Sequence, residues 1–555
     1  MSGKRPSREA IAWREIGTTT ISRSMAVLLT AFFLVTVYLV PLGQNVYDRR
    51  HGTAASFGLQ SGGASSPGES VFARIDRQNN AILESIHQLE NTLEEGSLLR
   101  QVFLPPLQYV LLRFLGKGNE KAIPGRDGWL HFAPDLDYLA GPPFLHPDQL
   151  RIRAEAHKLW EKPIQPDPLT AIIDFKNQLT ARGIALIVLP VPVKAALQPD
   201  KISARKLLPP LANPSWPPFV QALRENNVQL FDARPVLTSY LEKHGEAYLP
   251  TDTHWLPGAM QAVAGELAQE ITREFPQISG AAGLEAQPQK VFGVGDIARM
   301  LTLPERAQLF SGQEVQVSQI LTGRHEFWQP DKNAEILLLG DSFTNIYSTE
   351  GLGWGVGAGF AEQLSYLLQA PLDLLARNDS GAYVTREMLA GELARGRDRL
   401  AGKKLVIWQF AERELAFGDW RLLALHLEQP KGAGFYVAPS GENTRVTGVV
   451  GAISRSVRPG TVPYRDNILT LHLVDLQGLD QQLQADQALV YGWGMRDNRL
   501  TRLAALRPGD SVSLTLTPWE TVEGELGSYR RTPLDDQIME LELPNWGILT
   551  DEKIP

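Results

Sequence analysis

Ser342 stands where a parallel sheet would expose a nucleophile. The apolar run 336–339 ends at Gly340, and the serine follows two residues later. A short apolar run that ends at glycine is typical of a buried parallel strand, and open α/β sheets bind ligands beyond the carboxyl ends of such strands. Because a free hydroxyl is a weak nucleophile, a serine at this place needs a base beside it.

His254 and Asp252 supply the other two groups that this chemistry requires. They are two residues apart in the segment 249–255, and residues two apart in an extended loop project to the same side. The Asp252 carboxylate can therefore hold the His254 ring. Serine, histidine and aspartate together are the groups that carry out acyl transfer.

A second Gly-Asp-Ser sequence, residues 509–511, has a different context. It follows Pro508 and precedes the alternating run 512–516. Pro-Gly-Asp ahead of an alternating strand is typical of a turn. The order of strand and motif therefore assigns catalysis to Ser342 and a structural turn to Ser511.

The overall composition excludes several other functions. The chain has 555 residues and a net charge of -8, with no block of Lys or Arg outside the N-terminus, so nucleic acid is not an expected partner. It has no cysteine, which excludes disulfides, thiolate metal sites and a cysteine nucleophile. No second histidine or acidic cluster stands at ligand spacing from His254, so we expect neither a metal nor a cofactor.

A membrane anchor is expected at the N-terminus. The basic tail 1–24 precedes the uncharged apolar segment 25–42. At about 1.5 Å per residue this segment reaches roughly 27 Å, close to the thickness of a hydrocarbon core. The excess of positive charge places the tail in the cytoplasm and the rest of the chain outside the inner membrane. The alternative is a cleaved signal peptide, but no small-residue cleavage site follows directly.

The middle of the chain predicts an α/β domain, residues 120–428, after a linker and helical stalk at 43–119. Strands are expected at 184–189, 228–231, 336–339, 372–375 and 404–408, and helices at 167–183, 257–275, 359–368 and 385–400. Strands that alternate with helices are typical of a doubly wound, mostly parallel sheet. The glycine-rich segment 351–357 lacks the Gly-Lys-Ser/Thr of a phosphate-binding loop, so we expect a mobile loop beside the site.

Residues 433–547 predict a second, all-β domain. Short strand-like runs separated by turn residues indicate a sandwich or small barrel of about five or six strands. These runs lie at 445–450, 468–473, 488–493, 512–516 and 538–543. Trp493, Trp519 and Trp546 could stack on sugar rings, although aromatic residues of a small β domain more often belong to its core.

Taken together, these motifs resemble a known family. The Gly-Asp-Ser that ends at Ser342, the upstream Asp-x-His-Trp that ends at Trp255, the turn 125–130 and the N-terminal anchor are similar to the SGNH hydrolase-like acetyltransferases of exopolysaccharide assembly. The alginate O-acetyltransferases are the best-known members. The resemblance covers about residues 120–427, and in that family the Asp-His pair precedes the serine, as it does here.

The resemblance implies a role for each residue of the site. Ser342 would be the nucleophile, His254 the base and Asp252 the acid that orients the histidine. It also implies a periplasmic site, a polysaccharide acceptor, and an acetyl group supplied by a membrane-bound acyltransferase. The C-terminal domain occupies the place where some members carry a carbohydrate-binding module.

Three further residues are candidates for contact with the substrate. Acyl transfer needs donors aimed at the developing oxyanion. The backbone N–H of Ser342 is one candidate and Asn378, just past the strand 372–375, is another, although a turn is an equally good interpretation of Asn378. Arg377 and Arg413 could contact an acidic or hydroxyl-rich sugar, with surface salt bridges as the alternative.

The function expected from the sequence is therefore that of a membrane-anchored periplasmic O-acetyltransferase. It would pass an acetyl group through Ser342 onto sugar hydroxyls of an exopolysaccharide. An acetyl esterase with the same triad would differ only in its acceptor. A non-catalytic scaffold of a polysaccharide export complex is the third alternative, and the intact set of Asp252, His254 and Ser342 argues against it.

Overall fold

The computed structural model describes residues 22–51, 79, 82, 83, 86 and 97–550, with short internal gaps. The gaps are residues 157–162, 279, 281, 305, 308, 324, 325, 379, 380, 395, 397, 428–433, 455, 456, 458–461, 463, 481, 507–509, 535–538, 540 and 541. The basic tail 1–21, most of the expected linker and stalk, and the turn at Gly509 thus lie outside the described residues. The chain divides into two compact units, Met1–Val102 and Phe103–Pro555.

The first unit contains one helix that is long and apolar enough to cross a membrane. It runs from Arg23 to Gln44, has a mean hydropathy of 2.4 and buries none of its length. Within it, α2 (Arg23–Leu34) passes through a short π-helical stretch (Val35–Leu39) into α3 (Val40–His51). A membrane anchor and a signal sequence share these properties, so the helix fits either of the two expectations.

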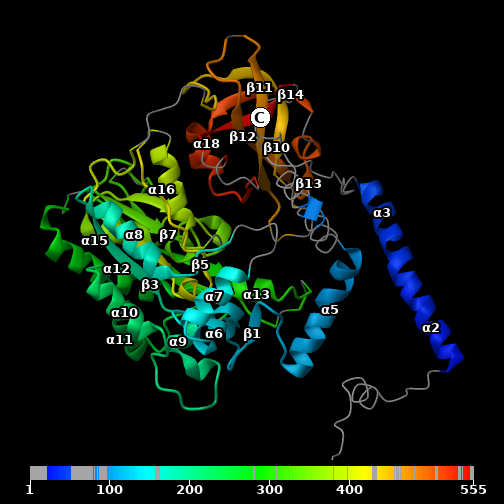
Figure 1. The fold of residues 1–555 in the computed structure, drawn as a ribbon, viewed down its shortest axis with the longest axis horizontal. Coiled ribbons are helices and arrows are strands. Elements are labelled where there is room, and N and C mark those ends of the chain that lie inside the picture. The colour runs from blue at the N-terminus through cyan, green and yellow to red at the C-terminus, as the bar shows by residue number, and fades with distance from the viewer. Residues whose placement is uncertain are drawn as a thin grey trace, which may run out of the picture. The chain divides into compact units, whose positions relative to one another are not determined.

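The second unit contains a five-stranded sheet in which all neighbouring strands are parallel (Figure 1). Their order is β4-β3-β9-β7-β8. The bounds are β3 (Ala185–Val191), β4 (Gln229–Leu230), β7 (Ile336–Gly340), β8 (Asp373–Ala376) and β9 (Leu405–Ala411). All five strands were expected from the sequence, because each is a short apolar run bounded by turn residues.

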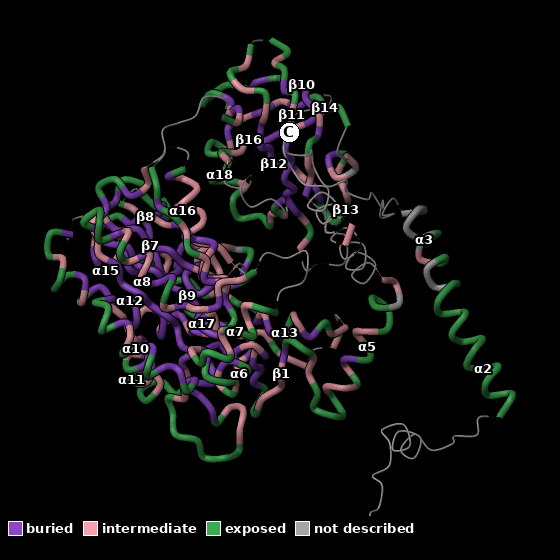
Figure 2. Tube along the Cα trace, viewed as in Figure 1, coloured by how far each residue is buried: buried purple, intermediate pink, exposed green. Residues whose placement is uncertain are grey.

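Helices cover both faces of this sheet. Successive residues of a strand point to opposite faces, so Leu338 belongs to one hydrophobic core while Leu337 and Leu339 belong to the other. In Figure 2, the buried residues are concentrated along these strands. On the Leu338 face pack α12 (Pro257–Glu274) and α15 (Phe360–Leu368); on the other face pack α8 (Pro168–Thr180), α10 (Trp216–Glu225) and α16 (Val384–Ala394).

Smaller elements surround the sheet. The segment 125–130 is the tight turn between β1 (Ala122–Pro124) and β2 (Leu130–Phe132), with Asp127 and Gly128 both at positive φ. The remaining helices are α5 (Leu98–Leu115), α6 (Ala133–Ala140), α7 (Pro147–Glu155), α9 (Lys194–Leu197), α11 (Arg234–His244), α13 (Asp296–Met300), α14 (Ser342–Asn345) and α17 (Glu414–Phe417).

One feature of this domain was not expected from the sequence. Strands β5 (Glu285–Gly293) and β6 (Gln313–Leu321) form a long antiparallel ribbon apart from the main sheet. Most of β5 is exposed, and its residues are largely polar, with Pro288 near the centre. β5 therefore lacks the apolar run of a buried strand, and the alanine and proline at its alternate positions are poor strand formers.

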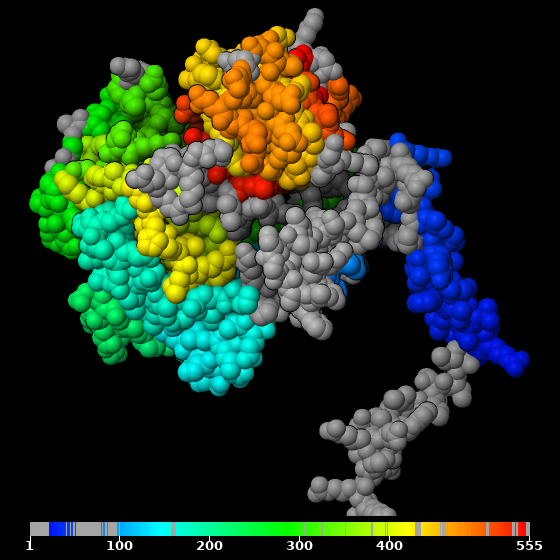
Figure 3. All heavy atoms as spheres, turned by 45° about the horizontal axis from the view of Figure 1, so that its top comes forward, coloured from blue at the N-terminus to red at the C-terminus, as the bar shows by residue number. Residues whose placement is uncertain are grey.

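The C-terminal domain contains a closed five-stranded barrel, which agrees with one of the two expected all-β architectures. Each strand pairs with two neighbours in the ring β10-β11-β12-β16-β14. Its strands are β10 (Thr444–Ile453), β11 (Asn467–Gly478), β12 (Ala488–Arg496), β14 (Ser511–Pro518) and β16 (Pro544–Leu549). Figure 3 shows the orange and red atoms of this domain gathered into one rounded body.

Short elements complete the barrel domain. They are β13 (Arg499–Leu500), β15 (Arg531–Thr532) and α18 (Trp519–Leu526). The last strand begins at Pro544, immediately after the run 538–543 that was expected to form it, and most of that run lies outside the described residues. Ser511 begins β14, which agrees with a structural role for the second Gly-Asp-Ser sequence.

Candidate active site

Ser342, His254 and Asp252 form one chain of hydrogen bonds. The Ser342 hydroxyl oxygen lies 2.8 Å from Nε2 of His254, and Nδ1 of His254 lies 2.6 Å from Oδ1 of Asp252. All three side chains are buried, with Ser342 at 7% relative exposure the most accessible. Because Asp252 faces Nδ1, the proton of the neutral ring belongs on that nitrogen, which leaves Nε2 to accept the serine proton.

The turn that carries Ser342 is fixed to the neighbouring strand β9. Asp341 accepts hydrogen bonds at Oδ1 from the Phe343 N–H and from Gln409 Nε2, both at 2.8 Å, and at Oδ2 from the Ala411 N–H at 2.7 Å. Gln409 in turn accepts from the Asp341 N–H at 3.1 Å. Asp341 therefore caps α14 and ties the end of β7 to β9.

The backbone N–H of Ser342 is available to a ligand. It is the first N–H of α14, and none of the described residues accepts a hydrogen bond from it. The first amides of a helix have no partner inside the helix. This N–H therefore suits the oxyanion role that was expected for it.

The Asp252 carboxylate is held by donors from its own loop and from two other segments. Its Oδ2 accepts from the Trp354 indole N–H and from the Asp296 backbone N–H, both at 2.9 Å. Its Oδ1 accepts from the backbone N–H of His254 as well as from the ring. Burial raises the pKa of Asp252, but the His254 charge and these hydrogen bonds outweigh it, so the net pKa is lowered and the carboxylate stays ionised.

The sequence did not identify Trp354 as a residue of the site. It predicted a mobile loop at 351–357, and this prediction is wrong for Trp354. The indole is fully buried in the core beneath the site. Gly353 and Gly355, on either side of it, adopt positive φ angles of 83° and 96°. Glycine reaches this region without strain, so the glycines of 351–357 allow a sharp turn that presses Trp354 inward against Asp252.

A second acid, Asp296, lies beside the relay. Its Oδ1 accepts from the Thr253 backbone N–H and its Oδ2 from the Thr253 hydroxyl, each at 2.8 Å, and Oδ2 lies 3.9 Å from His254 Nδ1. Burial and then repulsion from Asp252 raise the pKa of Asp296 to about 6. In the sequence, the one sign of Asp296 was that an acid directly follows a glycine, Gly295. In the structure, the missing side chain of Gly295 lets this segment contact the Thr251 backbone.

Asp252, His254 and Asp296 form an acidic cluster that spacing along the sequence did not reveal. Their potential ligand atoms all lie within 4.8 Å of one another. Every carboxylate oxygen of the cluster, however, already accepts a hydrogen bond from an N–H or O–H group. Hydrogen-bond donors therefore surround these oxygen atoms, where a metal site would need lone pairs that point at one ion. The cluster does not suit a metal ion.

Lys194 holds the loop that carries Asp252 and His254. Its ammonium group donates to the carbonyl oxygens of Leu249, Pro250 and Asp252, at 3.1, 3.2 and 2.7 Å. The side chain is fully buried, and burial lowers the pKa of Lys194 to about 8. The turn after β1 contacts the same loop, because the Leu130 N–H donates to Pro250 O at 2.9 Å.

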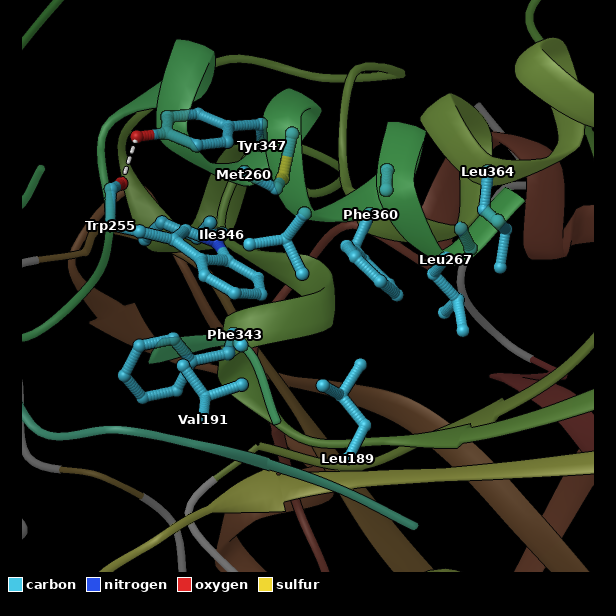
Figure 4. Close-up of a cluster of buried hydrophobic side chains, with 14 of the residues drawn as sticks. Leu189, Val191, Trp255, Met260, Leu267, Phe343, Ile346, Tyr347, Phe360 and Leu364 are labelled. Atoms are coloured by element: carbon cyan, nitrogen blue, oxygen red, sulfur yellow. Dashed lines mark hydrogen bonds between the residues drawn. The ribbon is translucent and has the colours of Figure 1, made fainter. Parts of the chain in front are cut away.

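Aromatic side chains adjacent to His254 and Ser342 form part of the buried core next to the site (Figure 4). Trp255 follows His254, and Phe343 follows Ser342. Their rings meet edge to face, with centroids 5.4 Å apart and planes at 89°. The Tyr347 hydroxyl, on the turn after α14, donates to the Trp255 carbonyl at 2.6 Å. Packing of these neighbours therefore sets the separation of His254 and Ser342.

The three other predicted residues fall in different places. Asn378 is brought to α14, the helix that begins at Ser342, because Asn345, one turn after Ser342, donates from Nδ2 to Asn378 Oδ1 at 3.0 Å. The half-buried Arg377 is placed by its backbone, whose N–H donates to Gly340 O at 3.0 Å. Both residues lie at the carboxyl edge of the sheet, as expected.

Arg413 forms an ion pair, but not the surface pair that was considered for it. Its Nη1 lies 3.0 Å from Asp135 Oδ1, and the two side chains are only 16% and 3% exposed. Its guanidinium also lies 5.1 Å from the centre of the Phe132 ring. Arg413, just before α17, therefore joins the segment after β9 to α6 inside the domain.

The three tryptophans of the barrel domain pack on one another. The Trp546 ring lies 5.4 Å from that of Trp493 and 6.0 Å from that of Trp519, between centroids. Trp546 is buried, and the other two are partly buried against the same cluster. This arrangement favours the core interpretation over sugar stacking.

Comparison with known proteins identifies the family to which the chain belongs. The family model described as "SGNH hydrolase-like domain, acetyltransferase AlgX" matches residues 122–412, just over half of the chain. The chain therefore belongs to this family of SGNH hydrolase-like, alginate-type acetyltransferases, and the resemblance expected from the motifs is confirmed at the level of the family. A search of curated proteins finds no match.

Solved structures similar to the chain include three bacterial proteins. The O-acetyltransferase domain of Pseudomonas putida AlgJ is 19% identical over 54% of this chain and 93% of that chain, with a TM-score of 0.41. Pseudomonas aeruginosa AlgX is 14% identical over 72% and 90%, with a TM-score of 0.37. Bacillus cereus PatB1 is 11% identical over 55% and 100%, with a TM-score of 0.33.

Proposed function

We propose that this protein transfers an acetyl group through Ser342 to a sugar hydroxyl of an exopolysaccharide. The observation that carries the proposal is the continuous hydrogen-bond chain from Ser342 through His254 to Asp252. Membership of the acetyltransferase family supports the acetyl group as the one transferred. The same hydrogen-bond chain would serve a hydrolase, so family membership is what favours transfer over hydrolysis, and it also argues against a non-catalytic scaffold.

The first half of the reaction forms an acetyl-enzyme. As the Ser342 hydroxyl oxygen attacks the acetyl carbonyl of the donor, Nε2 of His254 takes the hydroxyl proton. The negative charge that develops on the carbonyl oxygen is stabilised by the Ser342 N–H, with the Asn378 side-chain amide as the second donor. When the bond to the leaving group breaks, His254 returns the proton to that group.

The second half repeats these steps with a sugar as nucleophile. His254 takes the proton of the sugar hydroxyl, whose oxygen attacks the acetyl carbon. Collapse of the tetrahedral intermediate releases the O-acetylated sugar, and His254 gives the proton back to Ser342. Water would release acetate by the same steps, so transfer requires that the acceptor sugar compete with water at the buried serine.

The negative charges of Asp252 and Asp296 support the role of His254 as the base. Burial lowers the pKa of His254, but Asp252, followed by Asp296 and Asp341, raises it by more, and the net pKa lies above the ordinary 6.5. An ionised Asp252 stabilises the imidazolium that forms in each half-reaction. A base with a raised pKa is a stronger acceptor for the serine proton once it is neutral.

The setting of this reaction forms part of the proposal. The apolar helix Arg23–Gln44 would anchor the chain in the inner membrane, with the domain at 120–428 in the periplasm. A membrane-bound acyltransferase would then supply the acetyl group, since acetyl donors made in the cytoplasm must cross that membrane. Residues 433–547 would hold the polymer acceptor.

Intact mass spectrometry of the whole protein in detergent tests the covalent step. Incubation with a small activated acetyl ester should add one acetyl group to the wild type and none to Ser342→Ala. Ser511→Ala is the matched control, because it alters the second Gly-Asp-Ser sequence at an exposed strand start and should label like the wild type. Equal labelling of Ser342→Ala would refute the triad.

A further inference from the structure

Helix α5 carries an exposed apolar stripe. Phe103, Leu107, Val110 and Phe114 follow at steps of four, three and four residues, so they lie on one face of the helix. Their relative exposures are 62%, 55%, 46% and 73%. Isolated apolar residues are normal on a protein surface, but a continuous row of large side chains along a helix marks a surface that binds something.

The opposite face of α5 is held by the protein. Gln108 is buried and donates from Nε2 to the Lys117 carbonyl at 3.2 Å. Leu112, one turn later, packs against the small core that contains Leu130 and Ile297. The Gln108 bond is local to the end of the helix, whereas Leu112 turns this face of α5 toward the domain, so the exposed stripe faces away from it.

The charges of α5 differ from those of the chain as a whole. Between positions 98 and 118 the charged residues are Arg100, Arg113 and Lys117, all basic, whereas the whole chain has a net charge of -8. Arg113 and Lys117 are exposed near the end of the stripe. Basic side chains that flank an apolar face are typical of helices that lie in the surface of a membrane with anionic lipids.

The start of α5 is joined to the end of the apolar N-terminal helix. The Leu98 N–H donates to Oε1 of Gln44 at 2.8 Å, and both residues belong to the first compact unit. Gln44 is the last residue of the segment that is long and apolar enough to cross a membrane. If that segment spans the bilayer, α5 begins at the level where it leaves the lipid.

We propose that α5 is an interfacial helix whose stripe lies in the lipid surface of the membrane that Arg23–Gln44 enters. The stripe residues would sit among the acyl chains just below the headgroups, and Arg113 and Lys117 would reach the lipid phosphates. The helix does not span the bilayer, because Leu112 on its other face packs against the domain. This arrangement rests on the proposed anchor and not on acetyl transfer.

The absence of cysteine from the chain makes a direct test simple. Single variants of the whole protein, Leu107→Cys, Leu112→Cys, Leu208→Cys and Leu34→Cys, are spin-labelled in vesicles of phosphatidylethanolamine and phosphatidylglycerol. Collision with oxygen, which concentrates in lipid, is compared with collision with a water-soluble nickel chelate. Leu208, 80% exposed on the catalytic domain, controls for an apolar side chain in water.

The labels are expected to separate into three groups. Leu107 should favour oxygen at least several-fold over the Leu208 label, as the Leu34 label in the apolar helix should. Leu112 should be shielded from both reagents, because it faces the protein. Nickel access at Leu107 equal to that at Leu208 overturns the proposal, and so does shielding of Leu107 from both reagents, which would mean that protein covers the stripe.

The Leu34 label distinguishes failure of this inference from failure of the anchor. If Leu34 is in lipid and Leu107 is in water, the anchor stands and only the interfacial helix is wrong. If Leu34 is also in water, both are wrong. Acetylation of Ser342, measured separately, is independent of either result.

Discussion

The indole N–H of Trp354 donates to Asp252 Oδ2 at 2.9 Å, across 102 residues of sequence. The carboxylate that faces Nδ1 of His254 is thus held in turn by a fully buried ring. A hydrogen bond to a charged group contributes about 1.5–3 kcal/mol. Rotation of Asp252 away from His254 would therefore have to break this bond.

Trp354→Phe should lower kcat by about 10- to 100-fold with little change in KM, since each 1.4 kcal/mol of lost stabilisation is about tenfold in rate. Trp328→Phe is the control. Trp328 belongs to the same core, and its indole N–H donates to Ser365 Oγ at 2.8 Å, away from the triad. Equal losses in the two variants would mean that Trp354 serves the fold and not the relay.

Asp296→Asn should move the acid limb of the kcat/KM profile to lower pH by about one unit. Asp296 is ionised above about pH 6, and its charge helps to raise the pKa of His254. His254 acts as a base only when neutral, so a lower pKa makes it competent at lower pH. Asp480→Asn, an exposed acid of the barrel domain, should leave the profile in place. If the acid limb does not move in Asp296→Asn, the charge of Asp296 does not affect His254, and Asp296 only holds Thr253 in place.

Lys194→Met should lower both the free energy of unfolding and kcat, because three buried carbonyls lose their donor. We expect a loss of roughly 2–4 kcal/mol by chemical denaturation. Lys194→Arg keeps the charge and should recover part of kcat. In the wild type, kcat/KM should fall above about pH 8, where the neutral amine has only two N–H groups for three carbonyls.

Lys201→Met is the control for Lys194→Met. Both lysines lie 5.3 Å from the centre of the Trp129 ring, but only Lys194 donates to the loop at 249–252. Lys201→Met should keep the wild-type kcat and the same alkaline limb. A similar loss in both variants would point to the Trp129 contact as the cause.

Deletion of residues 433–547 should leave acetyl transfer from a small ester to a monomeric sugar nearly unchanged. Transfer to the long polymer should fall through a higher apparent KM, because a second binding site on the chain raises the effective concentration of acceptor at the first. The comparison of short and long acceptors measures this difference. Equal loss on both would assign the domain to support of the catalytic fold, and no loss on either would contradict a role in holding polymer.

The sequence was sufficient for the elements that follow local rules. The strand before Ser342 is a continuous apolar run, and the pair Asp252 and His254 is close in sequence, so both could be predicted. The helix at Pro168–Thr180 is recognisable from Asp167, which caps it, and from the proline that follows. Each of these signals lies within a few residues of the feature that it predicts.

The groups that hold the triad could not be predicted, because their partners are distant in sequence. Trp354 lies among glycines, which are typical of an exposed loop, and only the folded core shows that the ring turns inward. Asp296 follows strand β5, which is almost entirely exposed and has no apolar run to mark it in the sequence. Lys194 carried a clearer signal, a single charge within an apolar stretch from Val191 to Leu197, which indicates a buried cation with fixed partners.

The reciprocal hydrogen bonds between Asp341 and Gln409 have an evolutionary consequence. The Asp341 backbone N–H donates to Gln409 Oε1, and Gln409 Nε2 donates to Asp341 Oδ1, between the ends of two neighbouring strands. Replacement of either side chain alone would leave a polar group of this pair unsatisfied. The two positions should therefore change together among relatives that keep the nucleophile. A lineage that lost the serine would be released from this constraint, and its two positions would drift apart.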